Sequence, residues 1–388
     1  MKNEQQESRV KNPVSLRWKL LFLLSSTISF DTRTSSLLGY EAKQILHALE
    51  KLKKDGLIRC SSTRPMQVTW TQKGLDVLRR EDPDVYAYYM RISNDNRPGG
   101  DAAHCVLRKR DAEVKAMMFA AGVGIGAQNP GLMDVLSEQA KPLRRPQAAY
   151  YSSRELIFGN EQKQTRMRRS RSSGLLLSPG FQGRVYHPDH QEFRLSVSAE
   201  LTVNVLAVQL ANKLYRELGV REITESLLIC DESEVLRIFE TESHGKRHTI
   251  GDAVRLPGIT RTSYRYIPLS TSGVELLNFI TKVPKRNIQI GVFETLIREE
   301  LGREALPGEL TEQNLRQGYF ELNGYREYEF LSSDVTVLYR LLKQNSSEDT
   351  HSLSCWRSQE KLIRSIFRPE QVRLWIFRDE DMEADQWI

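Results

Sequence analysis

Two stretches of the chain decide the fold of its first part: residues 41–60, EAKQILHALEKLKKDGLIRC, and residues 67–75, QVTWTQKGL. The first predicts a helix from Glu41 to Lys54, a stop at Asp55-Gly56 and a short strand. The second predicts a strand and then a helix that begins after Thr71, because threonine is a favoured N-cap residue. A helix over residues 16–24 and a polar break at residues 29–34 come before them. This order of elements is that of a winged helix-turn-helix.

The predicted helix over residues 41–54 has two faces. The 3.6-residue period places its apolar positions on one side: Ala42, Ile45, Leu46, Leu49 and Leu52. Lys43, Gln44 and His47 lie on the opposite side, early enough in the helix to reach base edges, and Lys51 lies nearer to where phosphates would be. The helix therefore has the pattern of a recognition helix.

Arg59 and Arg64 flank the turn between the two predicted strands, where a wing would contact the DNA backbone or the minor groove. The sequence thus favours duplex DNA binding by residues 1–95. Two alternatives stay open. One is an amphipathic helical unit whose charged face is merely solvated, and the other is a winged helix that docks a protein.

The charge of the chain is unevenly distributed. Residues 1–95 carry 16 Lys and Arg against 11 Asp and Glu, a net charge of +5, and residues 96–175 carry 14 against 7, a net charge of +7. The remaining residues carry 26 against 32, a net charge of −6. Basic charge concentrated in one part of a chain favours a nucleic-acid partner for that part.

The composition bounds the broad class of the protein. The 388 residues, 39% of them hydrophobic, are enough for two or three domains. The four cysteines lie far apart without a C-x-x-C spacing, which argues against a zinc ribbon and against a disulfide framework. The longest apolar run near the start, residues 20–24, is too short to cross a membrane. We expect a cytoplasmic protein without a membrane segment.

Residues 96–175 are expected to form a basic linker with a helical segment. Their densest cationic cluster precedes Ser172-Ser173-Gly174, and arginines beside hydroxyls and a glycine suit phosphate contact. A solvated helix end is the equal alternative. The glycines at 122–126 match no nucleotide-binding pattern and predict a helix stop with a loop. The cationic cluster consists of Lys163, Arg166, Arg168, Arg169 and Arg171.

Residues 176–345 are expected to form a mixed α/β domain. Short strands are expected at residues 184–187 and 193–197, and an apolar helix at residues 201–218. Apolar runs at residues 225–230 and 264–269 are each followed by a helical pattern, which favours a partly parallel sheet. Asn323-Gly324, between two strand-like runs, predicts a hairpin with a type I′ turn. Residues 346–388 are expected to be a carboxy-terminal extension with an acidic tail. The fold class is therefore α/β, or α+β over the whole chain.

Catalytic patterns are weak in this sequence. Asp231 and Glu232 follow a predicted buried strand, where a metal-dependent nuclease would hold Mg²⁺, but they also suit a solvated helix N-terminus with Asp231 as its cap. The E-x-K spacings at residues 113–115 and 161–163 lie outside strand-like runs. Nickase and tyrosine-recombinase patterns fail at residues 187–190 and 244–249, respectively. We expect no enzyme activity, no metal site and no cofactor, with Mg²⁺ needed only if the chain is a nuclease.

The chain resembles the replication-relaxation family of plasmids and integrative elements in low-G+C bacteria. The matching segments are residues 20–24, 48–58, 71–74, 170–174 and 266–273. The resemblance implies a DNA-binding accessory protein of plasmid replication or conjugative DNA processing. It also implies a restriction-endonuclease-like second domain without a clear active site, and a replication initiator or relaxase as partner.

Two other functions stay open from the sequence. One is a transcriptional regulator whose carboxy-terminal half senses a ligand or oligomerises. The other is a metal-dependent DNA nickase that uses Asp231 and Glu232. For any DNA-binding interpretation of the chain, a palindromic site would fit a homodimer.

Overall fold

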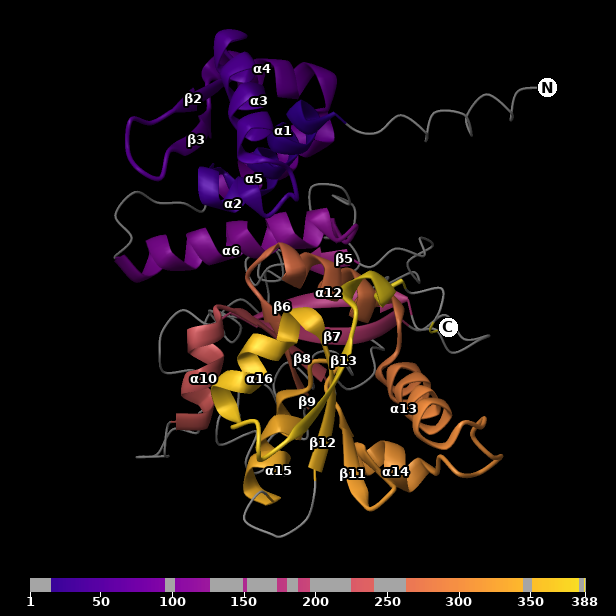
Figure 1. The fold of residues 1–388 in the computed structure, drawn as a ribbon. Coiled ribbons are helices and arrows are strands. Elements are labelled where there is room, and N and C mark those ends of the chain that lie inside the picture. The colour runs from indigo at the N-terminus through magenta and orange to yellow at the C-terminus, as the bar shows by residue number, and fades with distance from the viewer. Residues whose placement is uncertain are drawn as a thin grey trace, which may run out of the picture. The chain divides into compact units, whose positions relative to one another are not determined.

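A computed structural model describes residues 15–94, 102–125, 149–151, 173–179, 188–195, 225–240, 263–344, 351–383 and 387. The fold is a mixed α/β one with several small sheets (Figure 1). The chain divides into two compact units. The first comprises residues 1–120 and 125–130, and the second comprises residues 121–124 and 131–388.

The first unit holds a small antiparallel sheet among helices, with the strand order β1-β3-β2. The predicted helices and strands of residues 16–81 are confirmed. Residues 29–34, expected to be a polar break, instead form β1 and the start of α2, because Phe30 pairs with Val68 of β3 and the Asp31 side chain caps Thr34 N at 2.7 Å. The elements are α1 (Leu16–Thr27), β1 (Ser29–Asp31), α2 (Thr32–Ser36), α3 (Ala42–Lys54), β2 (Ile58–Cys60), β3 (Gln67–Trp70), α4 (Gln72–Glu81), α5 (Pro83–Asn94) and α6 (Ala102–Ala120).

Helix α6 belongs to the first unit and packs on its core. Residues 112–118 of α6 are buried, and the ring of Phe119 stacks on Phe22 of α1 with centroids 5.6 Å apart. The Lys115 ammonium donates a hydrogen bond to the Ser26 carbonyl oxygen at 2.8 Å. The first unit therefore extends past residue 95, and residues 102–120 are an integral helix of it rather than part of a linker.

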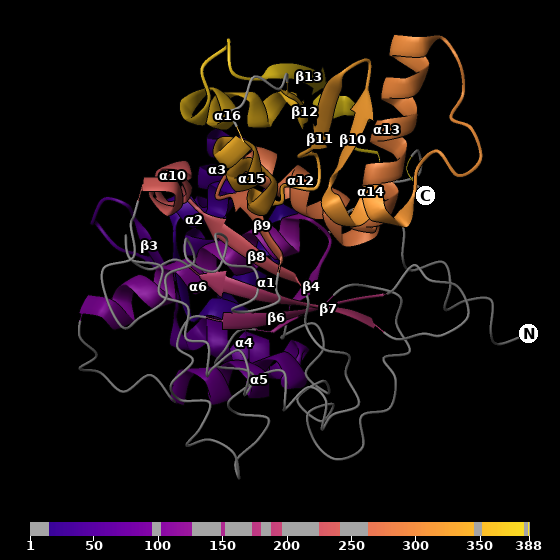
Figure 2. The ribbon, with the colours of Figure 1, turned by 90° about the horizontal axis from the view of Figure 1, so that it is seen from below.

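The larger sheet has the strand order β4-β5-β6-β7-β8-β9. The pairs β5–β6 and β6–β7 are antiparallel, whereas β7–β8 and β8–β9 are parallel, so the prediction of a partly parallel sheet is confirmed (Figure 2). Residues 184–187 and 201–218 lie outside the described residues. The elements are β4 (Gly124–Ile125), β5 (Ala149–Tyr151), β6 (Ser173–Pro179), β7 (Pro188–Leu195), β8 (Glu225–Cys230), α10 (Glu232–Glu240) and β9 (Ser263–Pro268).

A four-stranded sheet completes the second unit, with β10 and β11 antiparallel and β11, β12 and β13 parallel. The hairpin prediction is confirmed, since Asn323 and Gly324 have φ values of 51° and 80°, as a type I′ turn requires. The elements from residue 271 on are α12 (Thr271–Lys282), α13 (Lys285–Leu301), α14 (Glu312–Gln317), β10 (Tyr319–Leu322), β11 (Tyr325–Glu329), α15 (Val335–Gln344), β12 (His351–Trp356), α16 (Glu360–Ile366) and β13 (Arg373–Phe377).

Strand β12 shows that the carboxy-terminal residues are part of the second unit. All six of its residues are buried, and it lies between β11 and β13 in the sheet. Residues 351–377 are therefore an integral part of the fold, where an extension was expected.

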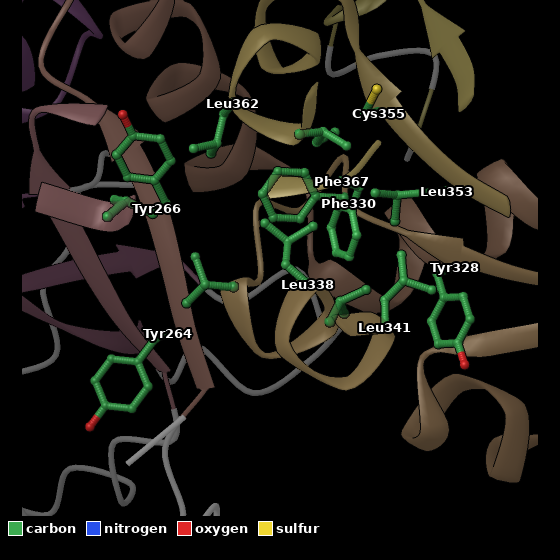
Figure 3. Close-up of a cluster of buried hydrophobic side chains, with 14 of the residues drawn as sticks. Tyr264, Tyr266, Tyr328, Phe330, Leu338, Leu341, Leu353, Cys355, Leu362 and Phe367 are labelled. Carbon is green, nitrogen blue, oxygen red and sulfur yellow. The ribbon is translucent and has the colours of Figure 1, made fainter. Parts of the chain in front are cut away.

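One apolar core joins the two sheets of the second unit. Tyr264 and Tyr266 of β9 belong to the same cluster as Leu338 of α15, Leu353 of β12 and Leu362 of α16, all labelled in Figure 3. The same helices cover both sheets, so strands β8 and β9 pack together with β11, β12 and β13 into one body. Among the described helices, none is long and apolar enough to cross a membrane.

Candidate nucleic-acid interface

Helix α3 has well-defined ends. At its start, the Gln44 side-chain oxygen accepts a hydrogen bond from the Glu41 backbone N–H at 3.2 Å. At its end, the chain reverses through Gly56, whose φ of +74° suits glycine. The last turn carries Lys51, Lys53 and Lys54, and these cations lie at the negative end of the helix dipole. Both ends of the helix are thus fixed, and its charged side chains remain exposed.

The buried stripe of α3 consists of Ile45, Ala48, Leu49 and Leu52. The prediction that Ala42 and Leu46 belong to this stripe is wrong, because Ala42 is exposed, Leu46 is 46% exposed, and Ala48 takes the buried place. The four residues predicted to face DNA, Lys43, Gln44, His47 and Lys51, are all exposed. Since the core side is fixed by its apolar contacts, these side chains share the opposite, outward side of the helix.

The two predicted wing residues lie on and beside the β-hairpin that follows α3. Arg59 is exposed in β2, where it pairs with Thr69, and Arg64 is exposed in the loop over residues 61–66. This loop projects away from α3 (Figure 1), and its shape is held by the Ser61 hydroxyl, which accepts from Gln67 N at 2.9 Å. Burial raises the pKa of the neighbouring Cys60 thiol against the opposing effect of Lys53, so the thiol stays protonated.

The cations of this surface keep their charge exposed. Within the part of the chain that the structure describes, none of six exposed cations of α3 and the hairpin forms an ion pair. The nearby carboxylate of Asp55 pairs with Arg17 of α1 instead. The surface can therefore hold anions at several points. The six cations are Lys43, Lys51, Lys53, Lys54, Arg59 and Arg64.

A corner between α3, β2 and α4 positions this surface. The Thr71 hydroxyl donates to the Gly56 carbonyl oxygen at 2.6 Å and accepts from Gly74 N at 2.9 Å, which confirms Thr71 as the cap of α4. Gly74 lies directly against Leu57, and a Cβ atom there would overlap the Leu57 carbonyl oxygen. Local sequence patterns do not reveal this close approach at Gly74, because it joins two segments that such patterns describe separately.

The other predicted site residues lie elsewhere or outside the described residues. The cluster over residues 163–171 is outside them. Asp231 and Glu232 lie at the carboxyl end of β8, where the Asp231 carbonyl oxygen accepts from Val235 N at the start of α10. The Glu232 carboxylate lies 3.3 Å from the Lys361 ammonium of α16. Among the residues that the structure describes, no three His, Cys, Asp or Glu side chains gather as a metal site would require.

The arrangement on α3 and the hairpin suits an extended polyanion, since its cations are spread along a helix and a loop instead of converging on one point. Comparison with known proteins found no family model, no curated protein and no solved structure that matches this chain.

Proposed function

We propose that the first unit is a winged helix-turn-helix that binds duplex DNA, with α3 in the major groove and the β2–β3 loop as the wing. The observation that carries this proposal is the set of six exposed cations on α3 and the hairpin that form no ion pair with described residues. When such cations contact DNA phosphates, counterions are released from the DNA, and this release drives association.

The order of elements supports the proposal. Helices α2 and α3 are joined by a short turn over residues 37–41, in which Gly39 has a φ of +77°. A short turn with a glycine is typical of the helix-turn-helix, whose second helix enters the major groove. The strand β1 completes a three-stranded sheet with β2 and β3, so the loop between β2 and β3 has a rigid base.

The role of the second unit is proposed from the resemblance to replication-relaxation proteins. We propose that it is a restriction-endonuclease-like domain without cleavage activity. It would dock a replication initiator, a relaxase or a second copy of the chain in plasmid replication or conjugative DNA processing. A transcriptional regulator remains the alternative, and it predicts a defined operator without any effect of such partners.

The test is the binding of the full chain to a fluorescent duplex, measured by anisotropy over a salt series. The logarithm of the association constant is expected to fall linearly with the logarithm of salt concentration. Lys51→Ala is expected to weaken binding and to reduce the salt slope by about 1. Lys43→Ala is expected to weaken binding as well. Lys361→Ala, which removes an exposed cation of the second unit, is the matched control and is expected to leave the slope unchanged.

Two results would change the assignment. An absence of binding at low salt would make the first unit a protein-docking module. Nicking of supercoiled plasmid in the presence of Mg²⁺, lost on Asp231→Ala or Glu232→Ala, would establish the nuclease function instead.

A further inference from the structure

Glu50 holds an unusual place on α3. Residues 43, 47, 50 and 54 are spaced by four, three and four positions, so they form one stripe along the helix. All four are exposed, and the stripe lies opposite the buried stripe of Ile45, Ala48, Leu49 and Leu52. Glu50 is thus a carboxylate in the middle of a face that is otherwise cationic or neutral.

The carboxylate of Glu50 has no partner in the part of the chain that the structure describes. It makes no ion pair or hydrogen bond with any residue in the described ranges, although Lys54 lies one turn further along the same stripe. Its neighbour one turn earlier is Leu46, which is 46% exposed. A carboxylate and an exposed leucine contribute nothing to phosphate binding, and the carboxylate opposes it.

The position on the stripe determines what such a side chain would meet. When a helix lies in the major groove, the line opposite its buried side faces the base edges, while the flanks face the two phosphate backbones. On the floor of the groove the hydrogen-bond donors are the amino groups of cytosine N4 and adenine N6. Guanine and the thymine O4 edge present acceptors, which would repel a carboxylate.

Cytosine fits a carboxylate better than adenine does. The adenine amino group has an acceptor on each side, its own N7 and the O4 of the paired thymine, whereas cytosine N4 has the guanine O6 on one side only and a C–H group on the other. The side chain of Leu46 would shield this contact from water, because it lies beside Glu50 on the exposed side of the helix. Such a contact would account for an acidic residue on a surface whose other charges attract a polyanion.

We infer that Glu50 is a specificity-determining residue of α3, whose carboxylate accepts a hydrogen bond from the N4 amino group of a cytosine in the major groove. This inference rests on the proposed DNA-binding function. It assigns sequence selection to Glu50 and leaves affinity to the surrounding lysines and arginines.

The test is selection of bound sequences from a random duplex pool by the full chain and by three variants. The parent chain is expected to enrich cytosine at one position by about tenfold. Glu50→Ala is expected to remove the preference at that position alone while raising affinity for unrelated duplexes. Glu50→Gln is expected to change the preferred base from cytosine to adenine, because glutamine pairs with adenine N6 and N7. Asp84→Asn, which removes an exposed carboxylate from α5, is the control and should leave every preference unchanged.

The outcomes distinguish the role of Glu50 from DNA binding itself. Binding by the parent with unchanged base preferences in both Glu50 variants would overturn the inference and leave the proposed function intact. So would binding by the parent without any preferred cytosine. Failure of the parent chain to retain any duplex at low salt would overturn the proposed function and the inference together.

Discussion

The buried ammonium of Lys115 in α6 donates a hydrogen bond to the Ser26 carbonyl oxygen near the end of α1, at 2.8 Å. The two residues are 89 positions apart in the chain. Lys115 is also 3.3 Å from the Asp111 carboxylate, and only 2% of its side chain is exposed. One buried cation thus caps the carboxyl end of α1, where helix carbonyl groups lack partners, and fastens α6 to the first unit.

Lys115→Met is expected to lower the free energy of unfolding of the first unit by about 3 kcal/mol, because Asp111 and the end of α1 lose their buried cation. Hydrogen exchange of peptides from α1 and α6 in a urea series would measure this loss. Arg80→Met is the control, since Arg80 is 72% exposed and lies 2.9 Å from the exposed carboxylate of Glu81. Its expected cost is at most about 1 kcal/mol. Equal costs for the two variants would refute a structural role for the buried cation.

Asp334 is expected to stabilise the second unit in a pH-dependent way. Burial alone would raise its pKa, but Lys285 and Thr336 outweigh burial and lower the pKa from 3.8 to about 2. A lowered folded-state pKa stabilises the protein above pH 3.8 and loses this effect as pH falls towards 2.

Asp334→Asn should therefore cost about 2 kcal/mol at pH 7, with a smaller cost at pH 3. The measurement is urea unfolding at both pH values, with hydrogen exchange at α15 as the probe. Glu304→Gln, which changes an exposed carboxylate of the same unit, is expected to have little effect at either pH. A cost for Asp334→Asn that does not change with pH would contradict the ion-pair explanation.

Gly74 is expected to tolerate no side chain. A Cβ atom there would overlap the Leu57 carbonyl oxygen and lie 2.8 Å from Cε3 of Trp70. Gly74→Ala should lower the stability of the first unit by about 3 kcal/mol, since backbone must move. Gly39→Ala is the control, because it has a positive φ but no neighbour within 4 Å, and its expected cost is about 1 kcal/mol. Similar melting temperatures for the two variants would disprove the close-approach argument.

Replacing either of two buried serines of the second unit by alanine is expected to change stability, in opposite directions for the two serines. The Ser354 hydroxyl has no hydrogen-bond partner among the described residues, whereas the Ser333 hydroxyl donates to the Tyr266 carbonyl oxygen and accepts from Gln359. Ser354→Ala should therefore raise stability by about 1 kcal/mol, and Ser333→Ala should lower it by a similar amount. Thermal unfolding of both variants provides the comparison, and destabilisation by Ser354→Ala would mean that a bound molecule satisfies its hydroxyl.

Sequence patterns predicted those features whose causes lie within a few residues of each other. The cap at Thr71 and the type I′ turn at Asn323-Gly324 are local, and both are confirmed. The exposed positions of α3 follow from its period, because Ile45, Leu49 and Leu52 define the buried side. The candidate DNA-binding surface was therefore accessible from the sequence, including Arg59 and Arg64 in the hairpin.

Features that depend on distant partners were not predicted. Strand β1 forms because β3 pairs with it, and the paired residues Phe30 and Val68 are 38 positions apart in the chain. Leu46 was assigned to the buried side from its apolarity, but Ala48 is closer to the middle of that side. Ser352 and Ser354 of β12 are fully buried, although serine is a mostly exposed residue type, so composition does not place this strand in a core. Such positions are decided by what packs against them, which periodicity does not show.

The strand order of the second unit also determines which strand edge stays unpaired until the end of the chain has been synthesised. Its parallel sheet is built in the order β11, β12, β13, and the fully buried strand β12 begins only at residue 351. During translation, β11 is therefore synthesised well before the strand that covers its open edge. Unpaired strand edges favour association with other chains. A chain truncated between residues 330 and 350 would thus expose the unpaired edge of β11, while its first unit would still have all its described helices and strands.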